Sequence, residues 1–420
     1  MKTKILLSFT FALCSGAAIA QSSNKAYAIT GDGNNDFLWM NIRQIDLKTG
    51  TVQKTLFDRK STTYSLTNVE TKATTSAAAI TDGNVYMNAA FPTGTFVAAA
   101  AYDNRSGKLF FMPMRHNELR WIDVNSNDAA PHFYSLPSDA LVKTNDNSDE
   151  AKHMTRMVIG ANGKGYAISN DGNNVIEFTT GKKITITTLG GLADSESNKG
   201  VSIHNKCSSW GGDMVADAFG KLLIVSAMHQ VFEVDITSRI ATHKGTISGL
   251  PANYTSNGVA VDAEGQLVVC SANVFEGYYR IKMEDLSATK IEGSDIKYNA
   301  SDLAGSNLLY QKQADAAKKF DLAKGILASN SQMNSSNKIF PNPVTGSSFT
   351  IKLDGAKDGV YHVLIADLTG RAMQNSKVAV LKGQQIVKIN IAGKPAKGSY
   401  LVTVFDGTKQ NIFSDKLLIQ

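Results

Sequence analysis

The chain has 420 residues, which is more than one hydrophobic core of ordinary size accommodates, so two or more domains are expected. Its formal net charge is +6, but the excess of lysine lies near the two ends and leaves the long middle part close to neutral. A near-neutral domain lacks the basic surface that a nucleic-acid-binding protein needs. Beyond the N-terminal region no stretch reaches about 18 consecutive apolar residues, so we expect no transmembrane helix.

Residues 1–20 have the three parts of a secretory signal peptide. A lysine-containing start is followed by the apolar run ILLSFTFAL, and the small residues Ala18 and Ala20 precede Gln21 at the usual processing positions. We therefore predict cleavage before Gln21 and export to the periplasm, and Gln21 is then a candidate for cyclisation. Cys14 raises a lipoprotein signal as the alternative, but the bulky leucine before it argues against lipid attachment.

Residues 21–311 carry a recurring β pattern. The segment KAYAITGDGNN at 25–35 returns almost unchanged as KGYAISNDGNN at 164–174. A second phrase, MVADAFGKLLIVSA at 214–227, recurs as VAVDAEGQLVVCSA at 259–272. In both copies apolar residues alternate on either side of a polar turn that ends in glycine, which is typical of a β-hairpin.

A third strand that ends in turn-forming residues follows most of these hairpins. The clear examples are IRQIDLKTG (42–50), ELRWIDVNS (118–126), NVIEFTTG (174–181), QVFEVDITS (230–238) and YYRIKMED (278–285). A further polar β segment comes after each, so the unit has four short strands and recurs every 40 to 60 residues or so. This pattern predicts the blades of a β-propeller.

The two ends of this domain are expected to complete one blade together. The strand around Tyr27 has no preceding partner strand, and ASDLAG at 300–305 has no convincing third strand, so pairing them closes the ring and removes open sheet edges. The sequence leaves five or six blades open. The hairpin candidate at 78–89 is either a sixth, irregular blade or part of a polar insertion, and we favour six. Phrases such as GVAVDAEGQLVV resemble the propeller repeats of the NHL and gluconolactonase-like families.

Residues 312–338 are expected to form a linker, in which QKQADAAKKFDLAKGILAS is able to form a short amphipathic helix before a polar stretch. Residues 339–420 show period-two alternation over five to seven short strands separated by glycine and aspartate, which predicts a small immunoglobulin-like β-sandwich. The expected fold class is therefore all-β: a five- or six-bladed β-propeller followed by a small Ig-like β-sandwich.

The order of phrases in the C-terminal module is more specific than its strand pattern. An FPNP start, a strand leading into DLTGR, a GSYLV strand and a basic-then-apolar last strand resemble the type A C-terminal sorting domain of the Bacteroidetes type IX secretion system. The residues that match the family's motifs are Phe340, Pro341, Asn342, Pro343, Gly370, Arg371, Gly398, Tyr400 and Lys416. The resemblance implies recognition by the type IX secretion machinery and passage across the outer membrane, with release or attachment at the cell surface. An ordinary Ig-like accessory domain is the alternative.

Ligand-face residues are sought where loops of several blades meet, because propellers bind there. The candidates are Arg115, His116, His153 and Trp210. The competing interpretation is that the histidines are satisfied by local hydrogen bonds and that the tryptophan packs between blades, since no histidine has metal-ligand spacing.

Calcium is a possible cofactor at three polar loops, residues 31–36, 145–150 and 170–174, which are rich in oxygen donors. These loops lack the spaced acidic ligands and terminal glutamate of an EF-hand, and the repeat explains two of them as turns. No other cofactor is expected.

Two aspartates and two cysteines complete the candidates. Asp217 and Asp262 recur at the same position of their hairpins and are interpreted as caps of the turns. Cys207 and Cys270 are the cysteines left after signal removal, and the sequence leaves open whether they form a disulfide.

The functional prediction is a secreted or cell-surface propeller that acts as a non-catalytic binding or scaffold module for protein or polysaccharide. The alternative is a calcium-dependent propeller hydrolase or lyase that acts on a sugar or lactone, and a third reading is a structural envelope protein. A polar, metal-competent central funnel would favour the enzyme, whereas an apolar or plugged channel would favour a binding module.

Overall fold

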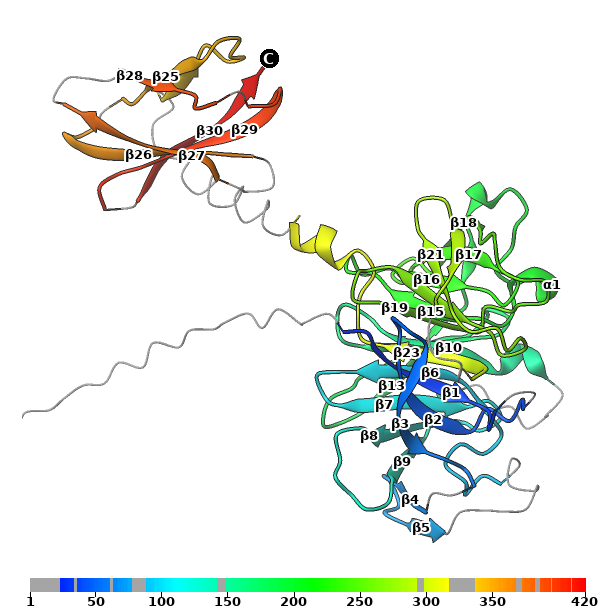
Figure 1. The fold of residues 1–420 in the computed structure, drawn as a ribbon. Helices are drawn as coiled ribbons and strands as arrows, with labels where there is room; N and C mark the ends of the chain where they lie inside the picture. Colours follow the sequence, from blue (N-terminus) through cyan, green and yellow to red (C-terminus); the bar gives the residue numbers. More distant parts are fainter. Residues whose placement is uncertain are drawn as a thin grey trace, which may run out of the picture. The chain divides into compact units, whose positions relative to one another are not determined.

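The computed structural model describes most of the chain (Figure 1). The described residues are 23–33, 36–60, 63–77, 88–141, 149–292, 298–316, 337–354, 356–367, 372–381, 386–393, 395–408 and 410–420. The chain divides into two compact units, Met1–Tyr310 and Gln311–Gln420. The hairpin candidate at 78–89 lies almost entirely outside the described residues.

The described part of the first unit forms five sheets, here called blades 1 to 5 and given from the innermost strand outwards. Blade 1 is β23 (Ala300–Gly305), β1 (Lys25–Thr30), β2 (Asn41–Asp46) and β3 (Thr51–Phe57). Blade 2 is β6 (Val97–Asp103), β7 (Lys108–Pro113), β8 (Glu118–Asp123) and β9 (His132–Pro137), followed by β4 (Tyr64–Asn68) and β5 (Thr74–Ala77).

The other three blades follow in chain order. Blade 3 is β10 (Met154–Ile159), β11 (Gly165–Ser169), β12 (Val175–Phe178) and β13 (Ile186–Gly190). Blade 4 is β15 (Asp213–Ala216), β16 (Leu222–Val225), β17 (Gln230–Asp235) and β18 (Ile240–Thr246), with β14 (Ala193–Asp194) at its outer edge. Blade 5 is β19 (Gly258–Val261), β20 (Leu267–Cys270), β21 (Tyr279–Lys282) and β22 (Ser287–Lys290). Short helical turns are η2 (Glu150–Lys152), η3 (Glu196–Asn198) and α1 (Lys206–Ser209).

The five innermost strands close a ring. They pack against one another in the cyclic order β23, β6, β10, β15 and β19, and β19 packs against β23 again. Strand β1 pairs antiparallel with β23, so the start and the end of the unit share one blade. The expectation that the chain ends complete a blade is therefore confirmed.

The ring built by the described residues has five blades, so the preference for six was wrong. A sixth blade built from residues 78–89 would have to lie between blades 1 and 2, but β23 and β6 contact each other directly there. The polar insertion instead supplies β4 and β5, which extend blade 2 outwards through a parallel pairing of β4 with β9. Hydrophobic periodicity cannot separate an added blade from an added edge strand, because both alternate with period two.

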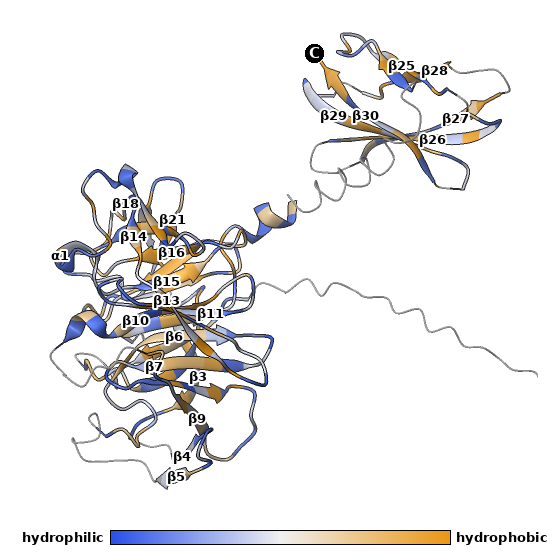
Figure 2. Cartoon of the chain, turned by 180° about the vertical axis from the view of Figure 1, so that it is seen from behind, coloured by the Kyte–Doolittle hydropathy of each residue, from blue (hydrophilic) through white to orange (hydrophobic). Residues whose placement is uncertain are grey.

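Apolar side chains fill the interfaces between neighbouring blades. Figure 2 shows the inner strands β15 and β16 coloured as hydrophobic. An aromatic cluster that includes Tyr27, Phe57 and Phe111 lies between blades 1 and 2, and further clusters occupy the other interfaces around the ring. Burial of these faces is the main force that holds the blades together.

The recurring aspartates cap the inner hairpins, as interpreted from the sequence. One carboxylate oxygen of Asp217 accepts hydrogen bonds from the backbone N–H groups of Phe219 and Lys221. Asp262 does the same for Glu264 and Gln266. The glycine of each turn has a positive φ, which favours glycine over any residue with a Cβ.

The C-terminal unit is a β-sandwich. One sheet is β24 (Lys338–Phe340), β25 (Ser348–Lys352) and β28 (Ile386–Asn390), and the other is β27 (Ala372–Val380), β26 (Gly359–Asp367), β29 (Gly398–Phe405) and β30 (Asn411–Ile419). Residues from both sheets form one core, among them Phe349, Val363 and Val402. The expected small Ig-like sandwich is thereby confirmed.

Candidate functional site

The central channel of the propeller is narrow, and most of the residues that line it are apolar, with Asn307 as the exception. A cavity of only about 10 Å³ lies between the inner strands. Its lining includes Ala100, Met157, Met214, Val259, Val261 and Leu303. This volume holds about one water molecule and no substrate.

Two buried carboxylates connect the inner strands. Asp213 accepts hydrogen bonds from the backbone N–H of Val259 at 2.7 Å and, more weakly, of Leu303 at 3.4 Å. Asp302 accepts one from Ala100 at 2.9 Å, while its other oxygen has no partner among the described residues. Together these bonds involve the inner strands of blades 1, 2, 4 and 5, so the pair acts as a polar hub of the ring.

Burial, and then the charge of Asp213, raise the pKa of Asp302. Burial also raises the pKa of Asp213, although three backbone hydrogen bonds and Arg156 oppose this. Asp213 has more partners that stabilise its negative charge, so Asp302 is the carboxyl group that is protonated more readily. The buried pair therefore retains one proton more readily than a pair of exposed carboxylates would.

Asp302→Asn is expected to flatten the pH dependence of stability. A carboxyl whose folded-state pKa is raised favours folding most below its unfolded value near 4, and that advantage is lost as pH rises through the folded-state pKa. The variant should match the wild type at pH 4.5 and gain in free energy of unfolding relative to it at pH 8. Urea unfolding at both values measures this, and a constant difference between the two proteins at both pH values would contradict it.

Two fully buried arginines fasten loops to the blades, and sequence reasoning did not single out their clamping role. Arg156 of β10 donates to the backbone carbonyls of Ser169, Asn170, Ser209 and Gly211, and so ties blade 3 to the α1 loop of blade 4. Arg120 of β8 donates to the carbonyls of Ala89, Phe91 and Pro92 and pairs with Glu118. The available signal was an arginine within a largely apolar strand in MTRMVI, and an arginine between two apolar residues in ELRWID.

The four ligand-face candidates lie on three blades: Arg115 and His116 on blade 2, His153 before β10 of blade 3, and Trp210 on blade 4. Burial, and then the charge of Arg115, lower the pKa of His153, so these two residues from blades 2 and 3 lie near each other. His116 shares its loop with Arg115, and the Nε2 atoms of His116 and His153 are buried without a hydrogen-bond partner in the described structure. Trp210 follows α1 on blade 4, where its indole N–H donates to the carbonyl of His204 at 3.0 Å.

The polar loops offer little to a calcium ion. Asp32 forms ion pairs with Arg59 and Lys60, and Asp171 accepts hydrogen bonds from Ser169 and Asn173. Both carboxylates therefore already have partners within the protein. The loop at 145–150 is described only from residue 149. Within the described ranges, no cluster of three His, Cys, Asp or Glu residues has the arrangement of a metal site. Cys207 is an exposed free thiol and Cys270 a buried one, so they do not form a disulfide here.

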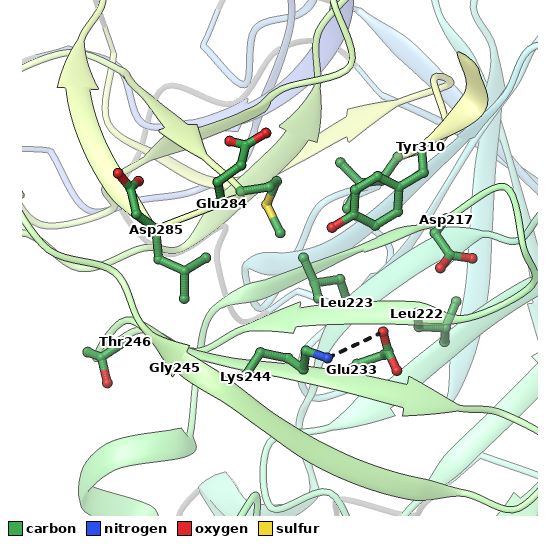
Figure 3. Close-up of a pocket in the computed structure, with 13 residues that line it drawn as sticks. Asp217, Leu222, Leu223, Glu233, Lys244, Gly245, Thr246, Glu284, Asp285 and Tyr310 are labelled. Atoms are coloured by element: carbon green, nitrogen blue, oxygen red, sulfur yellow. Dashed lines mark ion pairs between the residues drawn. The ribbon is translucent and has the colours of Figure 1, made fainter. Parts of the chain in front are cut away.

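A groove of about 510 Å³ lies between blades 4 and 5 (Figure 3). Its floor is apolar, with Leu222, Leu223, Met283, Leu286 and Leu309. Figure 3 shows Tyr310 and Asp217 at one end and Asp285 with Thr246 at the other. No sequence pattern pointed to this groove, because its walls come from two blades and from the segment that leaves the ring.

Backbone pairing holds the aromatic residue of the groove in place. Leu309 donates to the carbonyl of Ala216 at 3.0 Å and accepts from the N–H of Ala218 at 2.9 Å, so the exit segment lies along blade 4. Tyr310 follows immediately. Burial first, and then the charges of Glu233, Asp217 and Glu284, raise the pKa of Tyr310, so its phenol stays protonated in a negatively charged surrounding.

The carboxylates of the groove differ in how far they are neutralised. Lys221 pairs with Glu233 at 2.7 Å, Lys244 lies 4.0 Å from Glu233, and Lys282 lies 3.7 Å from Asp285. Among the described contacts Glu284 has no ion pair, and only one oxygen of Asp217 is used in the turn cap. The groove therefore presents unneutralised negative charge beside an apolar floor.

The described sorting-motif residues lie on the strands β24, β29 and β30 of the sandwich and in the segment after β24. Asn342 donates to the carbonyl of Lys416 at 2.5 Å and accepts from the N–H of Leu418 at 2.9 Å, so the PNP segment is bonded to the last strand. Tyr400 on β29 donates from its hydroxyl to the carbonyl of Ala396. Gly398 begins β29, and Lys416 is exposed on β30. Gly370 and Arg371 lie outside the described residues.

Comparison with known proteins identifies the C-terminal unit. Residues 338–420 match the family described as the secretion system C-terminal sorting domain. No curated protein matches the chain.

Several solved structures resemble the chain. PorZ of Porphyromonas gingivalis, described as an essential bacterial surface component of the type IX secretion system, is 16% identical; the alignment covers 94% of this chain and 51% of PorZ, with a TM-score of 0.32. This chain thus spans about half the length of PorZ. A putative 6-phosphogluconolactonase of Bacteroides uniformis is 11% identical over 87% of this chain and 100% of its own, with a TM-score of 0.34. Virginiamycin B lyase of Staphylococcus aureus is 9% identical over 78% and 85%, with a TM-score of 0.27.

With identities and TM-scores this low, the propeller assignment rests on the sheet topology of the chain itself. That topology defines an all-β protein built from a propeller and a sandwich. The matched C-terminal family adds that the protein is a substrate of the type IX secretion system, exported to the cell surface or secreted. A search of the described helices finds none that is both long and apolar enough to span a membrane.

Proposed function

We propose that this exported propeller is a non-catalytic binding module, and that the groove between blades 4 and 5 holds an extended protein segment with a basic residue next to an apolar one. The observation that carries the proposal is the contrast between the two cavities: the groove measures about 510 Å³, whereas the channel measures about 10 Å³. An extended protein segment fits the groove but does not fit the channel.

The chemistry of the groove selects the kind of segment. Leu223, Met283 and Leu286 offer an apolar surface, and Glu284 with the free oxygen of Asp217 offers negative charge to a lysine or arginine. Such electrostatic complementarity contributes specificity and a faster association rate. The channel, at about 10 Å³, has no room for a sugar or a lactone, which argues against a hydrolase or lyase that binds its substrate there.

The test uses the mature full-length protein and two labelled octapeptides, one alternating lysine with leucine and the other alternating glutamate with leucine. Fluorescence polarisation is expected to show binding of the basic peptide only. Glu284→Lys should weaken it by at least about fivefold, because it replaces attraction with repulsion. Asp128→Lys, the same charge change in an exposed loop of blade 2, should leave the affinity unchanged.

Equal binding of both peptides, or full binding by Glu284→Lys, would refute the groove as a site for a basic segment. If the protein binds a polysaccharide and Tyr310→Ala abolishes that binding, the ligand of the groove is a glycan and not a peptide. A calcium-dependent rise in melting temperature that chelation reverses would favour the enzyme instead, because a ligand that binds only the folded state stabilises it.

A further inference from the structure

Blades 2 and 3 bring together a set of side chains with unusual ligand chemistry. A cavity of about 10 Å³ between them is lined by Met112, Met114, His116 and Met154, together with Pro113, Leu141 and Lys152. The first three come from the sequence MPMRH at the end of β7 and the turn after it, and Met154 is the first residue of β10. Three methionines and one histidine therefore line one small space.

The imidazole in this set has an open position. The Nε2 atom of His116 is buried and has no hydrogen-bond partner in the described structure. The nitrogen of a neutral imidazole is a common metal ligand. A buried polar atom without a hydrogen-bond partner raises the free energy of the folded protein, so a ligand bound to this atom would stabilise the fold.

The backbone of residues 112–116, here called the methionine loop, is held by hydrogen bonds before any ligand binds. Met114 donates from its N–H to the carbonyl of Phe96 at 2.9 Å, and Arg115 donates to the hydroxyl of Thr95 at 3.2 Å. His116 donates from its N–H to the carbonyl of Pro113 at 3.2 Å, which closes the turn. A preorganised loop binds a metal more tightly than a loose one, because less conformational entropy is lost.

We propose that Met112, Met114, Met154 and His116 form a binding site for a soft monovalent metal ion, with Cu(I) as its natural occupant and Ag(I) as a close analogue. Thioether sulfur is a soft ligand that selects Cu(I), whereas Ca²⁺ and Mg²⁺ require oxygen. All four ligands are neutral, which suits a single positive charge. The nearby ammonium of Lys152 is paired with Asp149 at 2.6 Å, so its charge is compensated.

The location of the protein fits this chemistry. The chain is exported, and thiols in an oxidising environment are lost to disulfides, whereas thioethers are not. A metal ion bound here would also join β7 of blade 2 to β10 of blade 3. The site is separate from the groove between blades 4 and 5, so this inference and the proposed function succeed or fail independently.

The test measures Cu(I) affinity of the mature full-length protein by competition with a chromogenic Cu(I) chelator, with ascorbate present. Cys207→Ser serves as the background, because the exposed thiol of Cys207 is a competing soft ligand. One equivalent of Cu(I) is expected to bind, and Ag(I) should raise the melting temperature whereas Ca²⁺ and Zn²⁺ should not. Copper X-ray absorption should show sulfur neighbours.

The variants Met114→Leu and Met154→Leu should each lower the Cu(I) affinity at least about tenfold, since each removes a direct ligand. Leucine is close to methionine in volume, so these proteins are expected to fold. Met157→Leu is the matched control: Met157 is buried in the same core cluster but does not line the cavity, and its replacement should leave binding unchanged. The proposal is overturned if the protein binds neither Cu(I) nor Ag(I), as expected for a cavity that holds only water. It is also overturned if all three variants bind Cu(I) equally well.

Discussion

Arg156→Met is expected to destabilise the propeller by about 3 to 5 kcal/mol, because several buried carbonyl groups lose their hydrogen-bond donor at once. Arg156 has no exposed surface and its guanidinium donates to four backbone carbonyls. Burial lowers its pKa to about 10, so the side chain remains charged at neutral pH and its donors stay in place. Urea unfolding at pH 7 measures the change in free energy.

Arg239→Met is the graded control for this prediction. The side chain of Arg239 makes one described hydrogen bond to a carbonyl, that of Gly191, and the residue is only partly buried. Its loss should cost no more than about 1 kcal/mol. If Arg156→Met and Arg239→Met had the same small effect, the clamp between blade 3 and the α1 loop would have no structural importance.

Ala28→Asp is expected to reduce the free energy of unfolding by more than about 4 kcal/mol or to prevent folding, because it puts an unpaired charge into the strand that closes the ring. Ala28 has no exposed surface, and β1 pairs with β23 on one side and β2 on the other. Loss of this strand would also expose the edge of β23. Circular dichroism and thermal unfolding measure the effect.

Thr55→Asp adds the same charge to the outer strand of the same blade, where the side chain is exposed. Its effect should stay within about 0.5 kcal/mol, as for most surface substitutions. Equal stability of the two variants would show that the closing strand contributes little to the ring.

Much of the fold could be predicted because it depends on local patterns. The strands around Ile42, Val175 and Val231 each lie third in their blades, as their position after a hairpin predicted. The turn caps at Asp217 and Asp262 follow from residues two to four positions apart. In each case the interacting groups are neighbours in the chain, so their spacing in the sequence already describes their contact.

The candidate sites, in contrast, are formed by residues that lie far apart in the sequence. Met154 reaches the methionine loop from another blade, and Tyr310 enters the groove from the segment after the last inner strand. The number of blades depends on the direct contact of β23 with β6, whose residues are about 200 positions apart, as the 202-residue separation of the bonded pair Ala100 and Asp302 shows. Loop patterns around Arg115, His153 and Trp210 could not predict which of these residues would meet.

By itself the sequence determined the repeated four-strand unit, the closure of the ring by its two ends and the sorting module, because hydrophobic periodicity and short motifs encode these locally. The signal peptide at residues 1–20 lies outside the described residues and stays a prediction. Only the tertiary structure decided the five-blade count, the narrow channel, the buried arginine clamps and the two cavities between blades. These features depend on which side chains from different blades share one space, and packing of the whole ring, not spacing along the chain, selects those neighbours.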